Sequence, residues 1–184
     1  MSNASPETTF KVTIASPDGR TLNAEHLQLY GYWNQLRGNR AMPSWQDWDW
    51  MQLPTSAIPW CTVVDVKRDP LSFYYRFWGS SRTNLYGMDY TGKSISEVKP
   101  QTIGNKIFIE YAQLIEHKTP QFVITEKFTT DASLITYQML RFPFSAETHV
   151  TQILELSAYI DTELKKVHGY YHDVLPEDHP HKRD

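Results

Sequence analysis

The chain has 184 residues, of which 40% are hydrophobic and 14% aromatic, and its formal net charge is −3. This length suits one domain with a moderate core, and without a long basic run the chain lacks the charge pattern of a nucleic-acid-binding protein. Cys61 is the only cysteine, which excludes an intrachain disulfide. No apolar run reaches the roughly 20 residues that span a bilayer. We therefore expect a cytoplasmic protein with no membrane partner.

The N-terminal part is predicted to be an arm followed by a helix. Residues 1–22 form the arm, partly flexible, in which the alternating residues 10–14 are either a short edge strand or an extended segment. The helix is expected over 23–38, because Asn23 suits the N-cap and Gly38 the stop. Its apolar residues at helical spacing are Leu29, Trp33 and Leu36. This stripe needs a partner surface.

Residues 39–60 form an irregular segment rich in tryptophan and proline. Its tryptophans are Trp45, Trp48, Trp50 and Trp60. Its prolines exclude a continuous helix, and indole rings are unfavourable in water. We interpret the segment as a strap whose aromatic side chains anchor it to the core. An aromatic surface for a ligand or partner is the alternative.

A β-hairpin and a short helix are predicted next. Residues 62–66 and 73–78 are β-branched or aromatic and flank a turn that contains Pro70. Ser80 is expected to cap the helix, and Gly87 to end it in the left-handed conformation.

The second half is predicted to contain a long helix and three strands. Ser94 and Glu97 form a capping box for a short helix before it. The apolar face of the long helix, which ends at His117, consists of Ile103, Ile107, Tyr111, Leu114 and Ile115, and its opposite face mainly of Lys106, Glu110, Gln113 and Glu116. Strands are expected at 122–128, 134–142 and 150–160, and Pro143 is expected to end the middle one. Residues 161–184 read as a polar tail.

A series of short motifs runs through the chain: YW-x-x-LR-x-x-R-x-x-P, a strand ending in D-V, F-x-Y-R-x-x-G-S and G-x-D-x-T-G. The residues are Tyr32-Trp33, Leu36-Arg37, Arg40, Pro43, Asp65-Val66, Phe73, Tyr75-Arg76, Gly79-Ser80, Gly87, Asp89, Thr91 and Gly92. With the order of the elements, they resemble a family of short bacterial PAS-type proteins. The resemblance implies an α+β fold over residues 23–160: a five-stranded antiparallel sheet with a long helix and short helices on one face, plus the N-terminal helix. It also implies that the first hairpin stands between the later strands.

No cofactor or metal is predicted. Some PAS proteins bind haem through a histidine of the long helix, but no such motif surrounds His117. Cys61 stands too early for flavin photochemistry and is expected to be a buried small hydrophobe. The histidines of the tail are His168, His172, His179 and His181. They lack a convergent set of further ligands. Asp65 and Arg76 form either a structural ion pair or a site for an anionic ligand.

The resemblance, without a catalytic constellation, predicts a non-catalytic sensory or interaction module in signalling. We expect a small, partly apolar ligand between the long helix and the sheet, and a separate signalling protein as a partner. The expected pocket residues are Phe77, Tyr86, Phe108, Tyr111, Ile124, Tyr137, Met139 and Arg76. A homodimer is expected through the N-terminal helix, where the resemblance implies a packing or dimer contact. The expected interface residues are Leu29, Tyr32, Trp33 and Leu36.

Two other functions are considered. A small cone-shaped α+β enzyme would need a carboxylate and a hydroxyl donor in one pocket, and the pairs available are Asp89 with Tyr90 and Glu126 with Tyr137. Strand order would distinguish this enzyme from a PAS domain. The third possibility is a purely structural partner-binding subunit, which is favoured if side chains fill the pocket.

Overall fold

The computed structural model describes residues 10–128, 134–146 and 148–159. The strands are β1 (Phe10–Ala15), β2 (Cys61–Arg68), β3 (Leu71–Trp78), β4 (Gln121–Phe128), β5 (Leu134–Ala146) and β6 (His149–Tyr159). The α-helices are α1 (Ala24–Arg37), α2 (Ser80–Tyr86) and α3 (Gln101–His117). The 3₁₀ turns are η1 (Trp45–Asp47), η2 (Trp50–Gln52), η3 (Ile58–Trp60) and η4 (Ile95–Glu97). The predicted α+β class is confirmed.

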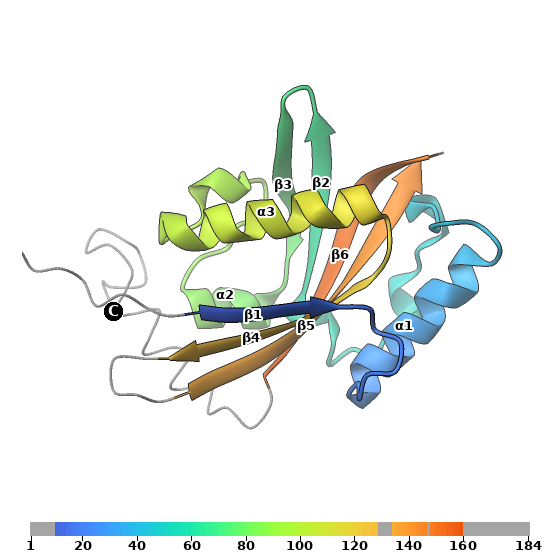
Figure 1. Ribbon diagram of the computed structural model, residues 1–184, viewed down its shortest axis with the longest axis horizontal. Helices are drawn as coiled ribbons and strands as arrows, with labels where there is room; N and C mark the ends of the chain where they lie inside the picture. Colours follow the sequence, from blue (N-terminus) through green and yellow to red (C-terminus); the bar gives the residue numbers. More distant parts are fainter. Residues whose placement is uncertain (1–9, 129–133, 147, 160–184) are drawn as a thin grey trace, which may run out of the picture.

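The strands form one antiparallel sheet of six in the order β1-β4-β5-β6-β2-β3 (Figure 1). The prediction of five strands omits β1, which pairs with β4 from Phe10 opposite Lys127 to Ala15 opposite Phe122. Of the two alternatives for residues 10–14, the edge strand is therefore right. The expectation that the hairpin stands between the later strands is wrong. Strand β2 pairs with β6, and β3 forms the other edge of the sheet.

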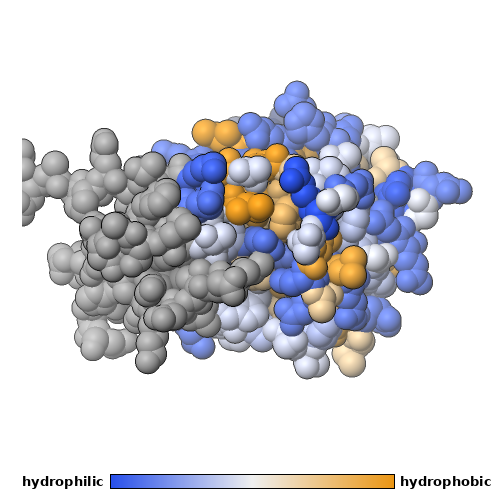
Figure 2. All heavy atoms as spheres, turned by 60° about the horizontal axis from the view of Figure 1, so that its bottom comes forward, coloured by the Kyte–Doolittle hydropathy of each residue, from blue (hydrophilic) through white to orange (hydrophobic). Residues whose placement is uncertain are grey.

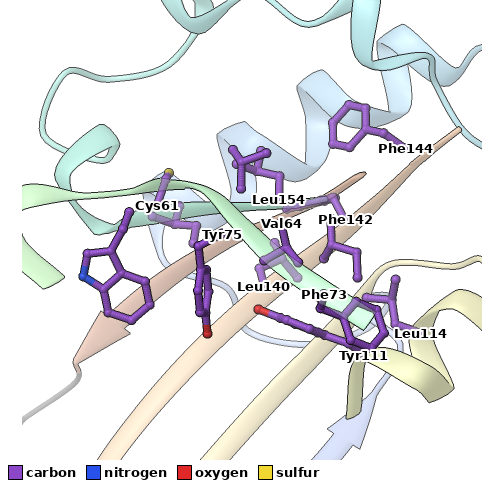
Figure 3. Packing of buried hydrophobic residues seen from close by; sticks show 14 of the residues in the cluster. Cys61, Val64, Phe73, Tyr75, Tyr111, Leu114, Leu140, Phe142, Phe144 and Leu154 are labelled. Atoms are coloured by element: carbon purple, nitrogen blue, oxygen red, sulfur yellow. The ribbon is translucent and has the colours of Figure 1, made fainter. Parts of the chain in front are cut away.

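The sheet is covered on two faces. We call the face beneath α2 and α3 the inner face; Phe73 of β3 contacts Tyr111 of α3 there, with ring centroids 5.5 Å apart. We call the opposite face, beneath α1 and the Trp-rich segment of residues 39–60, the outer face; Phe142 contacts Trp33 there at 6.0 Å. Figure 3 shows Phe73 and Tyr111 on one side of the sheet and Phe144 on the other.

Local chemistry sets most helix boundaries as expected. The Asn23 side chain accepts a hydrogen bond from the His26 N–H at 2.7 Å and caps α1. The capping box at η4 is present, and Gly87 ends α2 in the left-handed conformation with φ of 70°. The expected cap at Ser80 is wrong, because α2 begins there and Gly79 is its N-cap.

Strand β5 continues past Pro143, where we expected it to end. Pro143 lies opposite Ile153, and the pairing with β6 runs on to Ala146. Strand β4 begins at Gln121, opposite Arg141, so it does not extend beside Pro143. A proline without an N–H is tolerated at such an edge. Its carbonyl accepts a hydrogen bond from Nε1 of Trp33 at 3.0 Å.

The Trp-rich segment packs on the outer face. Trp45 and Trp48 lie 5.1 and 5.4 Å from the ring of Phe144, and Trp50 lies 5.5 Å from Phe77. Trp45 and Trp48 stack on each other at 6.1 Å. These contacts are those expected of an aromatic strap over the core.

Helix α1 also turns its apolar stripe toward the outer face. Leu29 and Trp33, which we expected at a dimer contact, are buried against the chain's own sheet, so in this conformation neither can contact a second chain. Tyr32 stacks on Trp48 at 5.0 Å, and only Tyr32 and Leu36 of the expected interface remain half-exposed. The homodimer stays a prediction.

Candidate functional site

A network of oppositely charged side chains is buried between α3 and the inner face. Its centre is Glu155 of β6. Oε1 of Glu155 lies 2.8 Å from Nη1 of Arg82, and Oε2 lies 2.7 Å from Nε of Arg141. The Tyr111 hydroxyl also donates to Oε2, at 3.3 Å. Side chains from α2, α3 and β5 therefore meet at one carboxylate, which is only 2% exposed.

Glu110 extends the network along α3. Its Oε2 lies 2.8 Å from Nη2 of Arg141, and its Oε1 lies 3.0 Å from Nζ of Lys106, one turn earlier in the helix. The expectation that Glu110 lies mainly on the polar face of this helix is wrong, because its side chain is buried. It follows Ile103 by two helical turns and so returns to the same face.

Opposite charges keep the network ionised in spite of its burial. Burial disfavours the ionised carboxylate of Glu155, but Arg141 and Arg82 outweigh it and lower its pKa to about 2. Burial also disfavours the charged guanidinium of Arg141, whereas Glu110 and Glu155 raise its pKa. Burial and the charge of Glu155 raise the pKa of Tyr111, so its hydroxyl keeps its proton and donates.

Strand alternation places the two central charges on the inner face. Arg141 stands between Leu140 and Phe142, and successive side chains of a strand point to opposite faces. Glu155 stands in the same way between two leucines of β6. The two residues lie directly opposite each other across β5 and β6. Sequence reasoning did not select either residue, although a lone charge inside an apolar strand was the available signal.

Five of the expected pocket residues lie on or beside the inner face. Tyr111 lies beneath Arg141, whose Cζ is 5.0 Å from the ring centroid, and Met139 Sδ is 3.9 Å from Nη2 of the same arginine. Tyr137 is two residues before Met139 in β5, on the same face. Phe108 contacts Phe73 at 5.2 Å, and Tyr86 contacts Trp78 at 5.5 Å.

The other three expected pocket residues lie on the outer face. Ile124 pairs with Gln138, on the side of the sheet opposite Met139. Arg76 and Phe77 are placed there by a β-bulge: Val63 faces Phe77 and Val64 faces Tyr75. Arg76 binds Asp65 through two bonds, of 2.7 and 3.1 Å, and its side chain is 45% exposed. Of the two alternatives for this pair, the structural ion pair agrees with the structure.

The acid–base pairs considered for an enzyme do not form a common site. Glu126 pairs with Lys11 at 3.0 Å and lies on the opposite face from Tyr137. Asp89 accepts a hydrogen bond from the Thr91 N–H at 2.8 Å. The Tyr90 hydroxyl accepts a longer one, at 3.4 Å, from the N–H of Lys99. Each of these carboxylates thus has a local structural partner.

The remaining candidates for chemistry have structural roles or lie outside the described residues. Cys61 is buried, as expected, and burial raises the pKa of its thiol to about 12. His117 is exposed in the last turn of α3. The four histidines of the tail lie outside the described residues. Within residues 10–128, 134–146 and 148–159, no three His, Cys, Asp or Glu side chains come together as a metal site requires.

The described surface is mixed. Exposed large apolar residues include Leu27, Met51 and Ile109. On the face in Figure 2, apolar residues form small groups separated by hydrophilic ones. Isolated groups of this kind are normal on a protein surface and do not define an interface. No helix among the described residues is both long and apolar enough to cross a membrane.

Comparison with known proteins gives one family match and several distant structural likenesses. A family model described as "PAS domain" matches residues 22–157. A light-oxygen-voltage domain studied with a flavin analogue is 14% identical, with 58% of this chain and 80% of that chain covered and a TM-score of 0.38. The PAS domain of a Colwellia psychrerythraea protein is 13% identical, with 55% of this chain and 86% of that chain covered and a TM-score of 0.38. An RNA-binding light-oxygen-voltage receptor is 12% identical, with 90% of this chain and 42% of that chain covered and a TM-score of 0.45. No curated protein matches the chain. Likenesses this distant carry no conclusion about function.

Proposed function

The chain belongs to the PAS domain family, whose model spans residues 22–157, and we propose that it is a receptor for a small molecule within this class of sensory or interaction modules. The ligand would lie between α3 and the inner face of the sheet, and a separate signalling protein would receive the output.

The observation that carries this proposal is the buried ionic network around Glu155. Burying charges costs free energy, and well-packed apolar side chains of similar volume often stabilise a core as well or better. Arg82, Arg141 and Glu110 are nevertheless buried together with Glu155 on the inner face. A network that stability alone does not require is a reasonable place for recognition.

The network also supplies a physical link between a ligand and the rest of the domain. Glu110 and Tyr111 belong to α3, whereas their partners Arg141 and Glu155 belong to the sheet. A ligand that competes for any of these bonds would change how α3 is held on the sheet. We propose that this change in α3 is the output.

A second candidate is the structural partner-binding subunit. Large side chains occupy the space beneath α3: Arg141, Tyr75, Tyr111 and Phe73 are all less than 2% exposed. Such filling is what we expected for a module that binds a partner without a small ligand. The two candidates differ in which cellular fraction should stabilise the chain.

The test is to measure the melting temperature in the metabolite fraction and in the protein fraction of a cell extract. The receptor predicts stabilisation by the metabolite fraction, and the structural subunit predicts stabilisation by the protein fraction alone. Native mass spectrometry of the purified chain should then show the bound metabolite. No shift with metabolites would overturn the receptor proposal.

A matched pair of variants locates the effect. Tyr111→Phe removes only the hydroxyl that donates to Glu155. It should change the rise in melting temperature that the metabolite fraction causes. Tyr30→Phe removes a hydroxyl bonded to Asp18 at 2.6 Å, away from the inner face, and it should leave the shift unchanged. Equal responses in the two variants would place the ligand elsewhere.

A further inference from the structure

Four polar residues and Trp78, whose indole carries an N–H, form a row across the inner face, one residue on each strand from β3 to β4. The strand pairing sets Trp78 opposite Thr62, Thr62 opposite Glu155, Glu155 opposite Arg141, and Arg141 opposite Gln121. All five are buried, none more than 5% exposed. Directly opposed residues have Cβ atoms about 4.5–5.5 Å apart, so the row is a continuous belt of side chains that can hydrogen-bond.

The belt has spare hydrogen-bonding capacity at its ends. Nε1 of Trp78, Oγ1 of Thr62, Nη1 of Arg141 and Oε1 of Gln121 are buried, and none has a partner in the part of the chain that the structure describes. Glu155, in the middle, is saturated by its cationic partners and Tyr111. Buried polar groups are nearly always paired, because leaving one unpaired costs free energy.

The end formed by Arg141 and Gln121 carries an unpaired donor and an unpaired acceptor on two directly opposed residues. Nη1 of Arg141 can donate, and Oε1 of Gln121 can accept. The charge of Arg141 is already met by two carboxylates, Glu110 at 2.8 Å and Glu155 at 2.7 Å. The network holds three cations, Arg82, Lys106 and Arg141, against these two carboxylates, so charge alone does not select the group that fits here. The vacant bonds, one donor and one acceptor, suit a group that both accepts and donates.

From this arrangement we propose that the ligand carries a carboxamide, whose oxygen accepts from Arg141 and whose N–H donates to Gln121. The inference rests on the proposed receptor function and names the chemical class of its ligand. A carboxylate has only acceptors, which would oppose the Gln121 oxygen. A ketone pairs with Arg141 and leaves Gln121 unpaired. The aromatic side chains nearby, Tyr111 among them, suit an apolar body on the same molecule.

The test uses three probes with the same ring and different head groups: benzamide, benzoate and acetophenone. Their dissociation constants are measured by calorimetry, and the melting temperature is followed at the same concentrations. Benzamide should bind about tenfold more tightly than the other two, since one well-made hydrogen bond in a buried site is worth about that factor. Benzamide should also raise the melting temperature most.

Two Gln→Leu variants serve as the test and its control. Gln121→Leu removes the proposed acceptor and should weaken benzamide binding about tenfold, while leaving the folded state at least as stable, because it removes a buried unpaired oxygen. Gln138→Leu makes the same change on the outer face of β5, where Oε1 is also unpaired. It should leave benzamide binding unchanged.

Several results would overturn the proposal. Benzoate binding as tightly as benzamide would show that the end of the belt takes an anion. Equal benzamide affinity in Gln121→Leu and the native chain would remove Gln121 from the site. If the metabolite fraction stabilises the chain and no probe binds, the carboxamide class is wrong and the receptor function stands. If neither has an effect, both proposals fail.

Discussion

Replacing Glu155 by glutamine should destabilise the chain strongly at neutral pH. Glu155→Gln keeps the volume of the side chain but leaves Arg82 and Arg141 buried without this carboxylate. Lowering the pKa of Glu155 from 4.5 to about 2 corresponds to roughly 3 kcal/mol of folding free energy at 1.36 kcal/mol per tenfold change. Breaking a buried ion pair costs about 3–5 kcal/mol in other proteins. The two figures agree, and we expect a loss of about 3 kcal/mol.

The pH dependence distinguishes this electrostatic cause from a packing defect. A carboxyl group whose folded-state pKa is lowered stabilises the fold fully above the unfolded value of 4.5. The native chain loses this contribution as pH falls from 4.5 toward 2, as Glu155 takes up a proton. Glu155→Gln has no such group to titrate. The difference in unfolding free energy between the native chain and Glu155→Gln should therefore become smaller as the pH falls across this range.

Urea unfolding, followed by circular dichroism at pH 7 and at points down to pH 2.5, measures both effects. The control is Glu126→Gln, which removes a partly exposed carboxylate paired with Lys11 at 3.0 Å. It should cost less than about 1 kcal/mol. Two results would refute the reasoning: a Glu155→Gln loss no larger than that of the control, or a difference in unfolding free energy that stays constant from pH 7 to pH 2.5.

Three further predictions concern single residues. A Cβ at Gly79 would come within 2.1 Å of the Pro59 carbonyl oxygen, so Gly79→Ala should cost about 3 kcal/mol or prevent folding. Gly31 in α1 has open space around it, and Gly31→Ala should instead stabilise the chain by about 0.5–1 kcal/mol in urea unfolding. Burial lowers the pKa of His26 below 6.5, so the unfolded chain binds that proton more readily; native stability should fall as pH drops below about 6.5, and thermal melts of His26→Gln should show a flatter profile. Cys61, with a pKa of about 12, should resist iodoacetamide in native buffer and react on unfolding; equal rates in the two states would contradict its burial.

Residue patterns along the chain predicted the elements well, because their signals are local. Asn23 caps α1 and Gly38 follows its last residue, as expected. The capping box at Ser94 also depends on residues three apart in sequence. The end of β5 was missed because it depends on a neighbour. Pro143 stays in the strand because β4 starts only opposite Arg141 and does not reach Pro143.

The site was predicted less well, because it depends on contacts between distant residues. Tyr111 and Met139 were expected between the long helix and the sheet, and they lie there beside Arg141. Phe77 was chosen for the pocket by its position and apolar character, and it lies on the other face, since a bulge shifts the register of β3 by one residue. The ionic network joins residues as far apart as Arg82 and Glu155. No local pattern predicts that such charges meet.

The distribution of indole rings between the two faces has a practical consequence for spectroscopy. Trp33, Trp45 and Trp48 pack on the outer face, whereas Trp78 lies on the inner face with the Arg82 guanidinium 4.5 Å from its ring. Total emission from the chain therefore sums signals from two separate layers. The difference in fluorescence between the native chain and Trp78→Phe reports the emission of Trp78, whose indole touches the ionic network.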